Sequence, residues 1–133
     1  MASENLMKEV RTYLDSYKED MLNVVVEQIA EDDGVDVDFI DPDEYVDSVE
    51  LKEAIEDDLS DKGFTDYEIG EIQEQQMTEE TCYKFLAYAI SLEDDYSTVD
   101  ELTNVLATSF YGNIENYTKE DLEKILKAFG SIK

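Results

Sequence analysis

The sequence has no histidine and only one cysteine, and these absences exclude several kinds of chemistry. Without histidine, Ser-His-Asp and Cys-His catalysis and His-ligated metal sites cannot form. A single cysteine, Cys82, excludes a disulfide and a thiolate zinc site within one chain, and it fits a reducing compartment. The five glycines lie singly, so no glycine-rich loop is present to hold a phosphate. We therefore expect a protein that is not an enzyme and that uses neither a cofactor nor a metal.

Long linkers and membrane segments are also missing. The 133 residues include one proline and five glycines, which leaves little room for linkers. No apolar run approaches the length of a membrane span, and the N-terminus lacks the basic-then-apolar order of a secretory signal. Nine tyrosines, five phenylalanines and a hydrophobic fraction of 42% distinguish the chain from an acidic disordered tail. We expect residues 1–133 to form a single acidic helical domain in the cytoplasm.

Apolar periodicity and capping residues predict an all-α fold of about six short helices. The expected helices begin at Ser3, Asp41, Thr65, Thr78, Ser97 and Thr118, and the first two end near Ala30 and Ser60. The fourth helix is the most apolar and is expected to be central to the core. On the fifth helix, Phe110 is expected to face inward. The alternation of valine and aspartate in residues 35–40 permits either a short strand or an extended loop.

The predicted second helix depends on the pair Asp41–Pro42. Aspartate is a good N-cap, and proline at the first helical position loses no donor that the helix needs. Glu44 completes the spacing of a capping box. In a helix that starts here, Ser48 and Leu51 would both face inward.

Charge is distributed very unevenly along the chain. The net charge is −26, and residues 31–80 hold 21 of the acidic residues but only two lysines, which is −19 of that total. Like charges repel one another and weaken the compact state, so a surface of this kind indicates a basic partner. It also argues against direct binding to nucleic acid or to an anionic membrane. Adaptation to high salt is an alternative, which the nine lysines beside a single arginine disfavour.

The acidic residues of the second predicted helix are expected to form a stripe. On a helical wheel, those at positions 43, 47, 50, 57 and 61 fall within about 80° of one another. Successive charges would lie roughly 5 to 6 Å apart over about 27 Å. Phosphates on one strand of B-DNA advance by about 3.4 Å along the axis, and their actual separation is somewhat larger because they wind around it, so the two charge spacings are comparable. A solvated helix normally mixes lysine with glutamate, yet residues 41–61 contain ten acids and only Lys52. The predicted partner-binding residues are Asp43, Asp47, Glu50, Asp57 and Asp61, with Glu53, Asp58, Glu71 and Glu74 as supporting charge.

In charge, size and helicity, the whole chain resembles the DNA-mimicking inhibitors of phages and mobile elements, the antirestriction and anti-CRISPR proteins. The resemblance rests on no alignable motif. It implies a small acidic protein that occupies the nucleic-acid groove of a host defence or DNA-handling protein, such as a nuclease complex. A phage-encoded protein of this kind would act in the cytoplasm of its host cell.

Two other classes stay open. One is an acidic adaptor or regulator that binds a basic protein through an apolar groove with Tyr83, Tyr88, Tyr96 and Tyr111 exposed. The other is a carboxylate-metal enzyme, for which residues 31–43 are rich in aspartate but lack the glycine position of a calcium-binding EF-hand loop. The sequence also leaves open whether the chain forms a homodimer.

Overall fold

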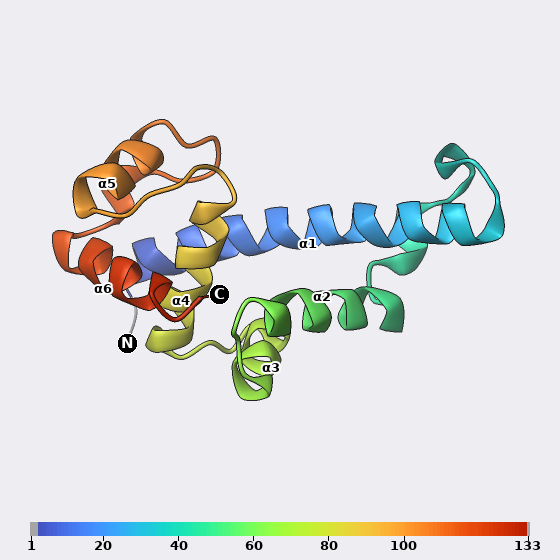
Figure 1. Cartoon of the computed structure of the whole chain (residues 1–133), viewed down its shortest axis with the longest axis horizontal. Helices are drawn as coiled ribbons and strands as arrows, with labels where there is room; N and C mark the ends of the chain where they lie inside the picture. The colour runs from blue at the N-terminus through green and yellow to red at the C-terminus, as the bar shows by residue number, and fades with distance from the viewer. Residues whose placement is uncertain (1–2, 133) are drawn as a thin grey trace.

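The computed structural model describes residues 3–132, and this part of the chain contains six α-helices and three short 3-10 turns (Figure 1). The helices are α1 (Glu4–Asp33), α2 (Val49–Asp61), α3 (Asp66–Glu74), α4 (Glu79–Ser91), α5 (Val99–Ala107) and α6 (Lys119–Phe129). The 3-10 turns are η1 (Val37–Phe39), η2 (Pro42–Tyr45) and η3 (Ile114–Asn116). These described residues contain no β-strand, so the predicted all-α class is confirmed.

Helix α1 runs along most of the length of the molecule (Figure 1). Ser3 caps its first turn by accepting a hydrogen bond from the amide of Leu6, and Gly34 ends it in the left-handed conformation with φ of 68°. Its apolar face packs against α4 and α2. Helix α2 lies beside the C-terminal half of α1, whereas α4, α5 and α6 gather around the other half (Figure 1).

The core is centred on α4, as the sequence predicted. This helix packs against both α1 and α6. The side chains of Phe85, Leu86 and Ile90 are fully buried. Because α4 has neighbours on several sides, nearly every residue from Thr81 to Ile90 is buried.

The predicted start of the second helix is wrong. Asp41 caps only the single turn η2, and α2 begins seven residues later, after Ser48. The Ser48 hydroxyl accepts from the amide of Leu51 at 3.2 Å and donates to the carbonyl of Tyr45 at 2.8 Å. Periodicity placed Ser48 inside a helix, but a serine that satisfies free amides is better suited to the N-cap position.

Two smaller expectations also fail. Residues 35–40 form neither a strand nor a fully extended loop, because the side chain of Asp36 accepts from the amide of Asp38 and the chain turns through η1. Helix α5 is capped by Thr98 rather than Ser97, and it ends at Ala107. Phe110 therefore lies beyond the helix and is 89% exposed, where the sequence predicted an inward side chain.

Candidate partner-binding surface

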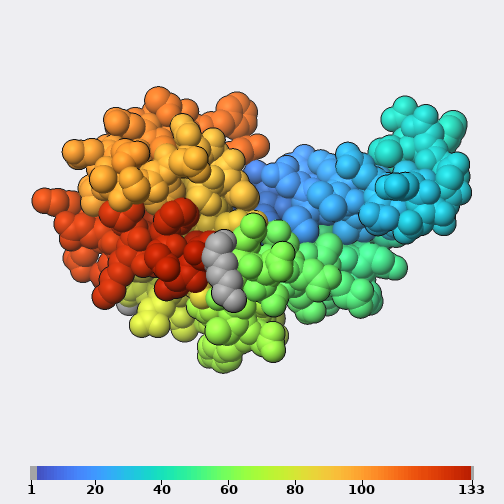
Figure 2. Space-filling model, viewed as in Figure 1, coloured from blue at the N-terminus to red at the C-terminus, as the bar shows by residue number. Residues whose placement is uncertain are grey.

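Residues 31–61 form the most acidic part of the molecule, which we call the acidic end. It comprises the last turn of α1, the turns η1 and η2, and α2, on the right in Figure 1. Figure 2 shows the same region in cyan and green. The segment contains 15 aspartates and glutamates but only one lysine, Lys52. Every one of these carboxylates except Asp58 is exposed.

The stripe predicted for the second helix is shorter in the structure. Four exposed residues, Glu50, Glu53, Asp57 and Asp61, lie within about 80° of one another on α2. They lie opposite the buried apolar face of the same helix, so the packing of that face fixes their direction. The stripe extends about 17 Å. Asp43 and Asp47 are exposed but lie before the helix, in η2 and the turn that follows it.

Lysines do not neutralise the acidic end. Among the described residues, ion pairs join Lys84 to Glu68 at 2.9 Å, and Lys124 to Glu79 and Glu120 at 3.3 and 3.1 Å. All three pairs lie outside residues 31–61. No lysine of the described residues therefore forms an ion pair with the carboxylates of the acidic end.

Two predicted site residues are used inside the fold. Oδ2 of Asp58 accepts hydrogen bonds from the hydroxyls of Tyr17 and Tyr88, both at 2.7 Å. Glu71 is buried, and its carboxylate accepts from the amide of Thr78 at 2.8 Å and from the hydroxyl of Thr81 at 3.0 Å. Asp58 thus ties α2 to α1 and α4, while Glu71 holds the start of α4.

Glu74, the last of the predicted site residues, is exposed at the end of α3. The structure therefore gathers Glu50, Glu53, Asp57 and Asp61 on one helix face, with Asp43 and Asp47 preceding that helix. It places Asp58 and Glu71 in internal hydrogen bonds, and it leaves Glu74 on a different helix.

The acidic end also exposes apolar side chains that the charge pattern of the sequence does not indicate. Phe39 is 85% exposed, and four valines are about half exposed. These valines are Val35, Val37, Val46 and Val49. The alternation of valine with aspartate in residues 35–38 was the signal, because in the absence of a sheet it leaves apolar groups in water. The surface thus combines anionic groups with apolar contact area.

The groove of tyrosines expected for an adaptor is not formed. Tyr83, Tyr88 and Tyr96 are buried, and only Tyr111 of that set is exposed, at 43%. Cys82 is buried as well, and burial first, then the nearby charges of Glu71 and Glu79, raises the pKa of its thiol to about 11. The thiol is therefore neutral near pH 7 and is not an activated nucleophile.

Within residues 3–132, no group of three or more acidic or cysteine side chains is arranged to hold a metal ion. No helix in the same range has the length and apolarity needed to cross a membrane. Comparisons with protein-family models, curated proteins and solved structures gave no match to this chain.

Proposed function

We propose that this chain is a non-enzymatic inhibitor that occupies the basic groove of a DNA-binding protein or nuclease complex, with carboxylates in place of phosphates. One observation carries the proposal: the acidic end has 15 carboxylates and one lysine, and no ion pair among the described residues involves them. Such a surface repels itself, so its field is expected to serve a cationic partner.

The stripe on α2 supplies the ordered part of this surface. Its members follow one another at three or four residues, which puts neighbouring carboxylates roughly 5 to 6 Å apart. The buried side chains Leu51, Ile55 and Leu59 hold the opposite face of the helix in place. Each carboxylate would accept charge-assisted hydrogen bonds from lysine or arginine, and the summed field would accelerate association.

A second candidate, an acidic adaptor for a basic protein surface outside any DNA groove, is favoured by the exposed Phe39 and the neighbouring valines. A groove that binds a sugar-phosphate backbone offers little to such side chains, whereas protein interfaces commonly bury aromatic groups at their centre. The two candidates therefore differ in whether duplex DNA competes for the same surface.

The proposal is tested by reversing three charges of the stripe, with Glu50→Lys, Asp57→Lys and Asp61→Lys combined. The matched control is Asp100→Lys, Glu115→Lys and Glu123→Lys, three exposed acids outside the acidic end. Both variants change the net charge equally, and each reverses one residue in the first turn of a helix, Glu50 or Asp100.

The measurement is capture of partners from a bacterial lysate at about 0.15 M salt, followed by parallel elution with duplex DNA and with concentrated salt. We expect the unaltered chain to retain a DNA-binding protein that duplex DNA elutes. The control variant should retain the same protein, and the stripe variant should lose it. Equal capture by both variants would show that the stripe is not the working surface. Elution by salt but not by DNA would favour the adaptor.

A further inference from the structure

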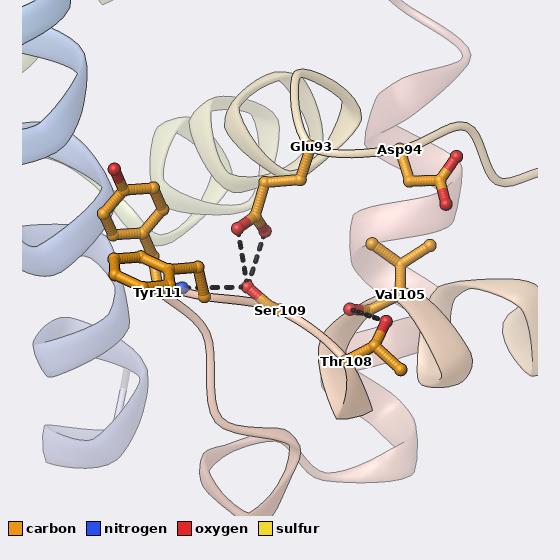
Figure 3. Close-up of a pocket in the computed structure, with 7 residues that line it drawn as sticks. Glu93, Asp94, Val105, Thr108, Ser109 and Tyr111 are labelled. Atoms are coloured by element: carbon orange, nitrogen blue, oxygen red, sulfur yellow. Dashed lines mark hydrogen bonds between the residues drawn. The ribbon is translucent and has the colours of Figure 1, made fainter.

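A hollow of about 480 Å³ lies apart from the acidic end, where the end of α4, the end of α5 and residues 108–111 meet (Figure 3). Glu93 and Asp94 follow α4 and line one side of the hollow. Figure 3 shows the carboxylate of Glu93 directed at Ser109, while Asp94, from the same turn, extends on the side of the view away from Tyr111. The lining includes no basic residue.

A hydrogen-bond network fixes the shape of the loop that borders the hollow. The hydroxyl of Ser109 donates to Glu93 at 2.6 Å and accepts from the amides of Tyr111 and Gly112 at 3.1 and 2.8 Å. Tyr13, from α1, donates to the same carboxylate at 2.7 Å. A Cβ atom at Gly112 would lie 2.5 Å from the Tyr13 hydroxyl, so the glycine permits this close approach. The loop is therefore held by its own contacts.

The fixed loop presents two aromatic rings to solvent. Phe110 is 89% exposed and Tyr111 is 43% exposed. Their ring centroids lie 5.0 Å apart at 84°, and the ring of Tyr111 also packs edge-on against Tyr13 at 6.3 Å. Since Tyr111 is braced against α1, Phe110 is held on the surface beside a carboxylate-lined hollow.

We propose that this hollow receives an arginine side chain of a partner protein. Aromatic rings attract a guanidinium group through their negative faces, and the carboxylates of Glu93 and Asp94 in the same lining attract the cation by their charge. Arginine suits this surface because its cation is planar and weakly hydrated. The lining carries negative charge and aromatic surface without any lysine, so it complements this cation. The inference does not depend on the acidic end acting as a DNA mimic.

The probe is the peptide acetyl-Gly-Arg-Gly-amide, added to the ¹⁵N-labelled chain at about 0.15 M salt and followed by NMR. The control is the same peptide with citrulline in place of arginine, because citrulline is neutral and has nearly the same shape. A single side chain should bind at roughly millimolar concentration. We expect saturable shifts at residues 93–95 and 108–112 with the arginine peptide, and much smaller ones with the citrulline peptide.

Three variants complete the test. Phe110→Ala and Asp94→Asn should each weaken binding at the hollow about fivefold. Both side chains are exposed, so neither change should disturb folding. Tyr67→Ala, which removes another exposed aromatic ring from α3, should have no effect on these shifts. Shifts spread over acidic residues throughout the chain, or equal binding by the Phe110→Ala variant, would overturn the proposal.

Discussion

Tyrosine hydroxyls, rather than lysines, bind several of the inward carboxylates of this chain. Tyr17 and Tyr88 donate to Asp58, Tyr83 donates to the buried Asp121 at 2.7 Å, and Tyr13 donates to Glu93. A phenol satisfies the oxygen without cancelling its charge. The protein can therefore build carboxylates into its helix contacts and remain strongly anionic. Sequence periodicity places Tyr13 and Tyr17 on the inward face of the first helix but does not reveal which acid each one meets, and it does not place Tyr83 or Tyr88 inward.

Removal of one phenol from this arrangement should destabilise the fold. Tyr17→Phe and Tyr88→Phe each leave Asp58 with one donor instead of two. A hydrogen bond to a charged group contributes about 1.5 to 3 kcal/mol, so each variant should lose about that much in the free energy of unfolding. Urea denaturation measures this loss. Tyr67→Phe, at a 75% exposed ring, should change little and is the control. An unchanged free energy of unfolding in both the Tyr17→Phe and the Tyr88→Phe variants would contradict the structural role of the Asp58 carboxylate.

The same tyrosines predict a loss of stability at alkaline pH. Burial, followed by the hydrogen bond and charge of Asp58, raises the pKa of Tyr17 and Tyr88 above the ordinary value of 10.0. Burial and the charge of Glu9 likewise raise the pKa of Tyr117. Above pH 10 the unfolded chain loses these protons while the folded chain keeps them, so ionisation favours unfolding. Tyrosine ionisation should therefore leave the free energy of unfolding unchanged below about pH 10 and lower it above that pH.

Urea titrations at several pH values, with tyrosinate absorbance as a second signal, test this expectation. Unfolding and ionisation of the buried tyrosines should occur together. Gradual ionisation of all tyrosines in a chain that stays folded would show that their hydroxyls are accessible to solvent.

At the scale of helices, the sequence predicts an N-cap well where one candidate residue stands alone. It predicts the start of a helix poorly where several candidate N-caps follow one another. Helices begin after Thr65 and Thr118, as the sequence predicted, and the structure shows a capping box at each start, Thr65 with Glu68 and Thr118 with Asp121. The region after Gly34 offers several cap residues in succession. Periodicity alone could not choose between Asp41 and Ser48 as the start of α2, because Ser48 also fits an inward helical position. The shortened stripe follows directly from that choice.

The position of this cap can be tested by two alanine substitutions. Ser48→Ala removes the N-cap of α2 and should cost about 1 kcal/mol in the free energy of unfolding. Asp41→Ala removes a cap from the single turn η2 alone, and it should cost less than about 0.5 kcal/mol. Urea denaturation with helical circular dichroism gives both values. The opposite order would mean that the helix begins at Pro42, as the sequence pattern suggested.

At the scale of the whole molecule, charge and packing are divided between regions. Helices α4, α5 and α6 gather around one half of α1, whereas α2, η1 and η2 cover the other half (Figure 1). The acidic end, residues 31–61, carries 14 exposed carboxylates and one lysine. Composition revealed the excess of charge because lysines are scarce in residues 31–80. It could not reveal which carboxylates face inward, since Asp58 and Glu71 differ from their neighbours only in what the fold places beside them.

This uncompensated charge predicts that salt stabilises the protein. The net charge is −26, and the screening length falls from roughly 30 Å at 0.01 M salt to about 8 Å at 0.15 M. Repulsion within the acidic end should weaken over that range, so the free energy of unfolding should rise by on the order of 1 kcal/mol or more. The ion pair between Lys84 and Glu68 is largely shielded from solvent, so added salt should weaken its attraction only a little. The variant with lysines at positions 50, 57 and 61 should be more stable than the unaltered chain at 0.01 M and gain less from added salt. A stability that falls as salt rises would show that attraction between charges, and not repulsion, dominates this fold.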